Sequence, residues 1–205
     1  MIWTKFENRE SALCPVAEIG YDKVPSCSVQ RNLQGVFRNV FCFRMEEEKM
    51  TETKFAPINS LQVLAYIIRR CEEMGIFINI TKLQKLMYCC YGTILGKFGV
   101  RLIDEPPSAW QYGPVFPEAL RSIQFFQIAG FRQKPTPDVD DLPESFRRVI
   151  DETLANFGKF TAKQLSEWTH IKGSPWYKAS DGGASLYHTL SDEDIKNYFR
   201  ANVLL

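Results

Sequence analysis

The clearest pattern in this 205-residue chain is a helical repeat of apolar residues between Pro143 and Gly158. Apolar side chains recur there every three or four residues, so they fall on one face of a helix. A helix with one wide apolar face is stable only when other elements cover that face. The pattern therefore predicts a fold in which helices pack around a shared core. The residues of this stripe are Phe146, Val149, Ile150, Thr153, Leu154 and Phe157.

Three more helices are predicted upstream of this stripe. Residues 60–74 hold so many apolar side chains that much of this helix should be buried. The next helix is predicted to begin at Thr81, whose hydroxyl would cap the backbone while Gln84 reaches back, as in a capping box. Pro117 suits the first position of a further helix, because a proline there loses no helical hydrogen bond. Between the last two helices, residues 108–112 are predicted to form a short strand before a Gly-Pro turn.

The last third of the chain has equally clear helix starts. Thr161 and Gln164 have the spacing of a capping box. Ser174 and Pro175 are typical of an N-cap followed by proline at the first helical position, and Ser191 is placed to cap a final helix. No internal repeat is visible. The sequence therefore predicts a mainly α, compact, single-domain helical fold with at most a small β element.

Charge and hydropathy narrow the class of function. The formal net charge is +1, with acidic and basic residues interspersed. Dedicated nucleic-acid binders usually show a basic excess, because phosphate contacts supply most of their affinity. A binding partner that is another protein suits this balance better. No stretch has the length and apolarity of a membrane span or of a signal peptide, so we expect a cytoplasmic protein.

The six cysteines and two histidines do not form a recognisable metal or disulfide pattern. There is no CxxC pair, and Cys89 and Cys90 are adjacent in the chain. Free thiols in a reducing compartment are the simpler interpretation. Glycine-rich phosphate loops are also absent. We therefore expect no cofactor, and we expect Lys82, Lys85 and Lys97 to solvate the outer face of their helix.

Residues 1–49 differ in character from the rest of the chain. They hold no helical period for long, and the best local pattern covers Phe37 to Phe43. Codons for the glutamates at 46–48 and for Lys49 are purine-rich, as in a ribosome-binding site ahead of a start codon. One hypothesis is that Met50 is the natural start, with residues 50–205 as the helical domain. The alternative is a genuine N-terminal arm that covers part of that domain.

Two groups of residues are candidates for a functional site. Trp110 and Tyr112 lie on a stiff loop rich in glycine and proline, where rigid aromatic side chains make good protein-binding anchors. The plainer interpretation is that they fill a gap between helices. His170 could serve as a base for Ser174 or a cysteine. Its place near a helix end favours a role in bonding terminal carbonyl groups instead.

Three sequence blocks, in order, resemble the Panacea domain, the family of SocA-like and GepA-like phage-associated antitoxins. They are residues 82–88 (KLQKLMY), residues 109–117 (AWQYGPVFP), and residues 165–170 (LSEWTH) with 173–176 (GSPW). The resemblance covers roughly residues 60–178. Cys89 and Cys90 stand where small or aromatic residues are more usual in the family, which affects packing only. The residues to which we assign a structural role are Thr81, Gln84, Gly113, Pro114, Pro117, Trp168, His170, Ser174, Pro175 and Trp176.

The resemblance implies a non-enzymatic antitoxin that neutralises a toxin encoded by an adjacent gene through direct protein contact. Trp110, Tyr112 and Phe116 are the candidate partner-binding residues, and the segment from Phe37 to Phe43 is another if the N-terminal arm is real. Two alternatives stay open. One is a DNA-binding regulator of its own operon, and the other is a small hydrolase that uses His170.

Overall fold

The computed structural model describes residues 56–133 and 141–204, and they form a mainly α fold, as the sequence predicts. The predictions for residues 1–49 concern a part of the chain outside these described residues. The helices are α2 (Ser60–Glu73), α3 (Ile80–Phe98), α4 (Pro117–Gln133), α5 (Glu144–Phe157), α6 (Ala162–Thr169), α7 (Pro175–Ala179) and α8 (Asp192–Asn202). The remaining elements are the strands β1 (Ser108–Trp110) and β2 (Gly113–Val115) and the 3-10 helix η2 (Asp181–Gly183).

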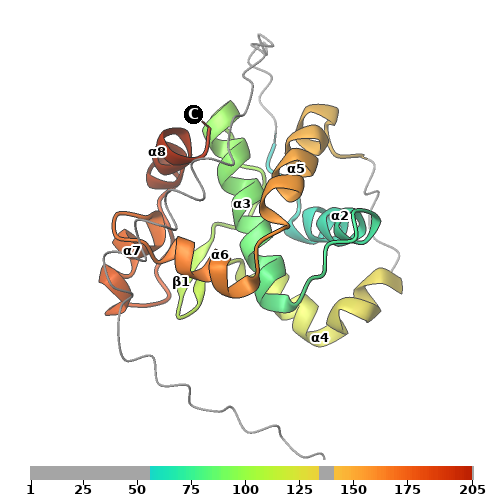
Figure 1. The fold of residues 1–205 in the computed structure, drawn as a ribbon, viewed down its shortest axis with the longest axis horizontal. Coiled ribbons are helices and arrows are strands. Elements are labelled where there is room, and N and C mark those ends of the chain that lie inside the picture. Colours follow the sequence, from blue (N-terminus) through green and yellow to red (C-terminus); the bar gives the residue numbers. More distant parts are fainter. Residues whose placement is uncertain (1–55, 134–140, 205) are drawn as a thin grey trace, which may run out of the picture.

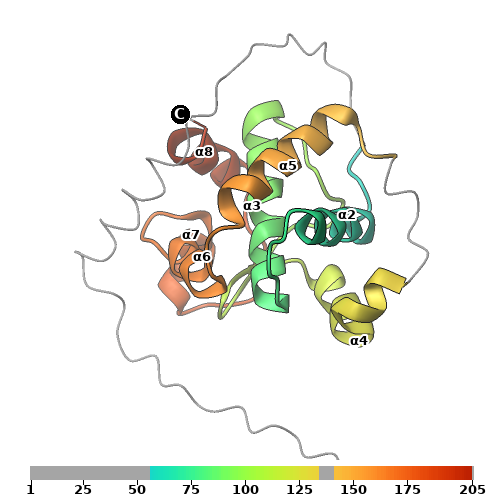
Figure 2. The same cartoon turned by 45° about the vertical axis from the view of Figure 1, so that its right-hand side comes forward.

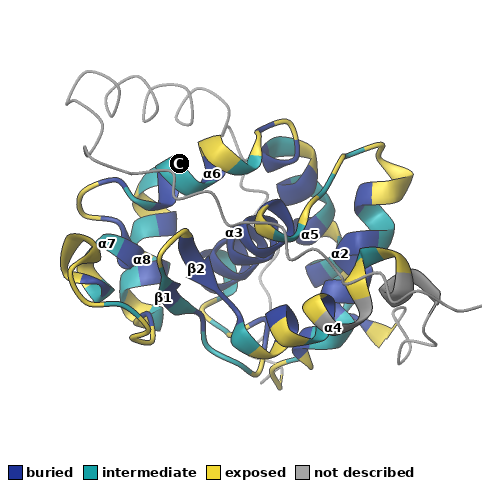
Figure 3. Cartoon of the chain, turned by 90° about the horizontal axis from the view of Figure 1, so that it is seen from below, coloured by how far each residue is buried: buried dark blue, intermediate teal, exposed yellow. Residues whose placement is uncertain are grey.

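Helix α3 is the centre of the fold. Every residue from Lys82 to Gly96 is buried, because α2, α4, α5, α6, α8 and β2 all pack against this helix. Figure 1 shows α3 running between α5 and α8, and Figure 2 shows α2 and α4 together beside it. In Figure 3 α3 is almost entirely dark blue, whereas the surrounding helices are yellow on their outer faces. A helix that is covered on all sides needs side chains that fit closely all round.

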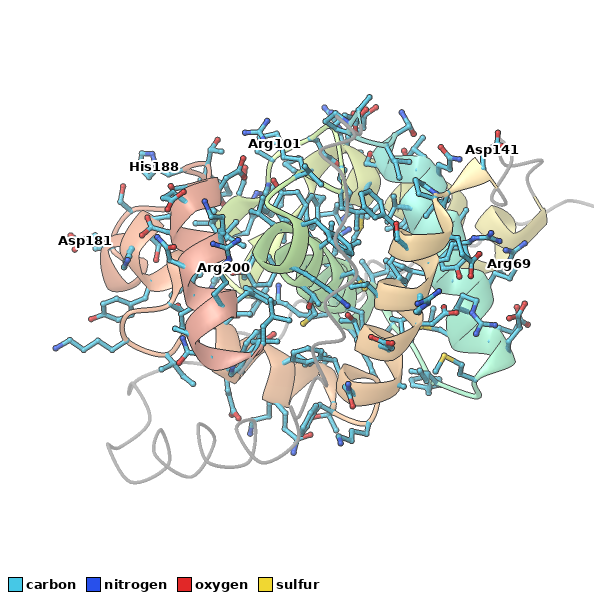
Figure 4. The ribbon with its side chains drawn as sticks, turned by 90° about the horizontal axis from the view of Figure 1, so that it is seen from above. Arg69, Arg101, Asp141, Asp181, His188 and Arg200 are labelled. Carbon is cyan, nitrogen blue, oxygen red and sulfur yellow. The ribbon has the colours of Figure 1, made fainter. Side chains whose placement is uncertain are left out.

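Helices α3 and α8 pack closely against each other. Gly92 lies so near the ring of Phe199 that a Cβ atom at this position would be 2.2 Å from its Cε2. Phe199 also packs edge-to-face against Tyr88, with ring centroids 5.6 Å apart. On the polar side, Arg200 donates a hydrogen bond to the Gly96 carbonyl oxygen at 2.7 Å, and Figure 4 shows Arg200 on α8. The glycine therefore sets how closely the two helices approach.

The predicted stripe of α5 is confirmed, since all six of its residues are buried. The capping box at Thr161 and Gln164 is also present, as are the N-caps at Ser174 and Ser191. Helix α4 begins at Pro117 as predicted, but its backbone breaks at Gln127 with φ 57° and ψ 166°. Each of these starts is encoded within a few neighbouring residues, which is why a local pattern finds them.

The predicted capping box at Thr81 is wrong. The N-cap of α3 is Asn79, whose side chain accepts a hydrogen bond from the Lys82 backbone nitrogen at 2.8 Å. The helix therefore begins one residue earlier than predicted, and Thr81 is exposed on its first turn. The Gln84 side chain is then free to bond outside its own helix.

The predicted solvation of Lys82 is also wrong. Its side chain is buried, and Nζ donates a hydrogen bond to the Gly158 carbonyl oxygen at 2.7 Å. This bond joins the first turn of α3 to the end of α5. Burial lowers the pKa of Lys82, because the charged amine loses its hydration.

Candidate partner-binding hairpin

The strands β1 and β2 form a tight antiparallel hairpin. Its register pairs Ser108 with Val115 and Trp110 with Gly113, so only Gln111 and Tyr112 make the turn. Gly113 has φ +103°, and a Cβ atom there would lie 2.5 Å from Thr169 Oγ1 and 2.8 Å from Lys85 Cε. Both the backbone conformation and the lack of space require glycine at this position.

Helix α3 holds one strand of the hairpin through two side chains. Gln84 Oε1 accepts a hydrogen bond from the Phe116 backbone nitrogen at 2.9 Å. Lys85 Nζ donates to the Pro114 carbonyl oxygen at 2.8 Å. Both side chains are buried, with Lys85 only 1% exposed. The prediction that Lys85 is solvated is therefore wrong, because the hairpin covers the side of α3 that a single helix would leave open.

Helices α6 and α7 hold the turn of the hairpin. The ring nitrogens of His170 lie 3.1 Å from the Gln111 carbonyl oxygen and 2.5 Å from the Ser166 carbonyl oxygen. Ser166 Oγ donates to the Tyr112 carbonyl oxygen at 3.2 Å, and the Trp176 indole N–H donates to the Trp110 carbonyl oxygen at 2.8 Å. The second sequence block therefore forms the hairpin, and side chains of the first and third blocks bond to its backbone.

This arrangement leaves few hairpin side chains on the surface. Tyr112 at the turn is 56% exposed. Trp110 is half-buried, and its ring meets the edge of Tyr187 with centroids 5.4 Å apart. Phe116 is fully buried, and it packs edge-to-face on Tyr91. Burial removes Phe116 from the candidate contact surface, because its side chain belongs to the core.

A third segment, which the sequence analysis does not predict, extends the hairpin. The Tyr187 nitrogen donates to the Ala109 carbonyl oxygen at 2.6 Å, and the Ala109 nitrogen donates to the His188 carbonyl oxygen at 2.8 Å. Tyr187 has φ 68°, a conformation that is unusual for a bulky residue, and it is 68% exposed. Figure 4 shows His188 and Asp181 on the left-hand edge of the described part. No local pattern marks this segment, because its pairing partner is nearly 80 residues away.

The contacts of His170 match those of a helix-capping histidine. Both ring nitrogens face backbone carbonyl oxygens, and Ser174 Oγ donates to the Thr169 carbonyl oxygen at 2.6 Å. Burial lowers the pKa of His170, and the nearby Lys85 lowers it further, although the two carbonyl contacts oppose this shift. Burial also raises the pKa of the Cys89 and Cys90 thiols far above their usual value. Both thiols are therefore protonated at neutral pH, and a protonated thiol is a poor nucleophile.

Metal ligands do not converge in the part of the chain that the structure describes. Among residues 56–133 and 141–204, no three side chains of His, Cys, Asp or Glu are placed to hold a metal ion. Cys71, Cys89 and Cys90 are buried free thiols. Within the same residues, no helix has the length and apolarity needed to cross a membrane.

Comparison with known proteins agrees with the three blocks. Residues 83–177 match the family described as antitoxin SocA-like, Panacea domain. The chain is 27% identical over 160 residues to the antitoxin SocA of Caulobacter vibrioides (strain NA1000 / CB15N), an alignment that covers 70% of this chain and 83% of the relative. No solved structure matches. The predicted resemblance to the SocA-like Panacea family is therefore confirmed, and it supports an antitoxin role.

Proposed function

We propose that this protein is an antitoxin that neutralises a toxin encoded by an adjacent gene, in the cytoplasm, by direct protein–protein contact and without catalysis. The observation that carries the proposal is the Panacea domain together with the similarity to a protein named antitoxin SocA. We also propose that the hairpin turn, with Tyr112 at its tip, is part of the contact surface.

The way the hairpin is held supports this surface. The side chains of Lys85, His170 and Trp176 bond to its backbone oxygens, which leaves the Tyr112 ring exposed on a fixed support. A rigid aromatic side chain loses little conformational entropy when it binds, and tyrosine is enriched at interface hot spots. Trp110 on the hairpin lies beside Tyr187 on the segment that pairs with β1, and the two rings extend the aromatic surface.

The test of the antitoxin role is growth of a host that expresses the adjacent gene with and without the full-length chain. Restored growth is expected if the neighbour is a toxin that this chain neutralises. A neighbour that is harmless, or a toxin that the full-length chain leaves active, contradicts the proposal. Co-purification of the two proteins at a fixed stoichiometry distinguishes direct contact from repression of the toxin gene.

The contact surface has its own test. Tyr112→Ala is expected to weaken toxin binding at least tenfold, since a hot-spot side chain contributes about 2 kcal/mol or more. The matched control is Phe77→Ala, because Phe77 is 83% exposed but lies in the loop between α2 and α3. If titration calorimetry shows that Tyr112→Ala and the unmodified chain bind the toxin with equal affinity, the hairpin tip is not part of the contact surface.

The domain proposal can be tested in the same rescue experiment. We propose that residues 50–205 form the functional domain and that residues 1–49 are an extension. If residues 50–205 restore growth as well as the full-length chain does, the extension is dispensable. Rescue by the full-length chain alone makes the extension part of the interface, with Phe37 to Phe43 as the first segment to mutate.

A further inference from the structure

Two basic side chains lie together beneath the hairpin. Lys85 comes from α3 and His170 from the end of α6, and both bond to carbonyl oxygens of the hairpin. The Cβ position of Gly113 lies 3.0 Å from Lys85 Nζ and 2.5 Å from Thr169 Oγ1, so the hairpin backbone seals this space tightly. Residues 108–116 are therefore the lid over two groups that can each take up a proton.

The surroundings of Lys85 do not favour positive charge, whereas the half-buried His170 ring faces two carbonyl oxygens that partly offset the effect of its burial. An ammonium group can donate three hydrogen bonds, and the Pro114 carbonyl oxygen is the acceptor for Lys85. Cys89, one turn further along α3, is a titratable group whose charge would act on Lys85. Glu167 attracts the His170 ring and Lys85 repels it. Within residues 56–133 and 141–204, no ion pair joins Lys85 or His170 to a carboxylate.

We propose that the hairpin is a proton-coupled latch. Protonation of Lys85 and His170 favours a state in which residues 108–116 lift from α3 and α6, so that the buried Lys85 amine reaches water and the half-buried His170 ring becomes more exposed. Loss of these protons favours the closed hairpin seen in the structure. Closure involves only the hydrogen bonds and contacts described above, and no covalent step is required.

The direction of the coupling follows from the burial of Lys85. Burial lowers the pKa of Lys85 to about 7, whereas the open state restores the ordinary value of a lysine in water. The open state therefore binds more protons than the closed state between these two values. Since protons favour the state that binds more of them, opening becomes more frequent as the pH falls from 9 to 7. His170 adds to the effect at lower pH, because its pKa is also lowered by burial in the closed state.

The latch has a consequence that rests on the proposed function. Tyr112 is fixed at the surface only when the hairpin is closed, since its backbone is then held by Ser166 and its neighbours. Opening releases this support and makes the contact surface mobile. Affinity for the toxin is therefore expected to fall as the pH falls through the neutral range. The latch itself needs no toxin to be tested.

Amide hydrogen exchange of the full-length chain at pH 9 and pH 7 tests the latch. After correction for the intrinsic exchange rate, protection of the β1–β2 amides is expected to fall on the order of tenfold or more at the lower pH. Protection of α5 is expected to change much less, because the opening is local. In Lys85→Met, amide protection of β1–β2 should change with pH no more than that of α5. Methionine fills a similar volume to lysine but takes up no proton.

Lys82→Met is the matched control. Lys82 is also a buried lysine on α3, but it bonds to Gly158 rather than to the hairpin, so this variant should keep the pH-dependent protection of β1–β2. Hairpin protection that does not change with pH, or that still changes in Lys85→Met, overturns the proposal. If Lys85→Met does not fold, the proposal is tested by NMR titration of the Lys85 Cε signal in the unmodified chain. A titration with the pKa of an ordinary lysine also overturns the proposal. These results do not depend on the toxin, so failure of the latch and failure of the antitoxin role are distinguishable.

Discussion

The side-chain oxygen of Gln84 lies 2.9 Å from the backbone nitrogen of Phe116, and this buried hydrogen bond joins α3 to the end of the hairpin. The two residues are 32 positions apart, and both belong to the sequence blocks shared with the Panacea family. The bond leaves the Phe116 N–H satisfied at a place that water does not reach.

Gln84→Met is expected to destabilise the fold by about 1–3 kcal/mol, because methionine keeps the side-chain volume but leaves the Phe116 N–H without an acceptor. Urea denaturation measures the change. The control is Gln164→Met, where the glutamine belongs to an exposed capping box and the loss should be smaller. Equal losses at both positions argue against a special role for the Gln84 bond.

The cap of α3 gives a second prediction. Asn79→Ala is expected to cost about 1 kcal/mol in the free energy of unfolding, because it removes the side-chain acceptor for the Lys82 backbone nitrogen. Thr81→Ala should have little effect, since Thr81 is exposed and does not cap the helix. Thermal unfolding of the two variants compares the caps directly, and a larger loss for Thr81→Ala contradicts the assignment.

The predicted and observed helix starts show where sequence patterns are reliable. The helix starts at Pro117, Thr161, Ser174 and Ser191 depend on a residue and its nearest neighbours, and all four are present. At Thr81 the same kind of pattern fails, because an asparagine two residues earlier competes for the cap. The stripe of α5 is predictable because that helix has one buried face.

The hairpin contacts could not be predicted in the same way. Lys85 looks solvated on a helical wheel, since a wheel does not show that α3 is covered on every side. Its acceptor, the Pro114 carbonyl oxygen, is part of a turn that no side-chain pattern describes. The segment at Tyr187 joins the hairpin through backbone bonds and through the contact of its ring with Trp110. For Lys85 and Pro114 the resemblance to a family marks the residues, but only the structure gives their partners.

The contact between α3 and α8 gives a third prediction. Gly92→Ala is expected to lower the free energy of unfolding by about 1–3 kcal/mol, because the new methyl group would overlap the Phe199 ring. Combining it with Phe199→Leu makes room for that methyl group, so the double variant should lose less stability than the sum of the two single variants. Urea denaturation of the full cycle measures the coupling. If the stability losses of the two single variants add up to that of the double variant, the helices move apart to accommodate the methyl group instead.

The half-buried Tyr198 is expected to lower stability at alkaline pH. Burial raises the pKa of Tyr198 to about 12, whereas the unfolded chain ionises its tyrosines near their ordinary value. Because the folded pKa is the higher one, the stability that Tyr198 contributes is present below pH 10 and is lost as the pH rises through the interval between the two values. At pH 11 this loss amounts to about 1 kcal/mol. Tyr198→Phe removes the ionising group, so its melting temperature should fall less steeply between pH 9.5 and pH 11.5 than that of the unmodified chain. Tyr112→Phe serves as the control because Tyr112 is exposed, and identical alkaline slopes for all three proteins count against this account.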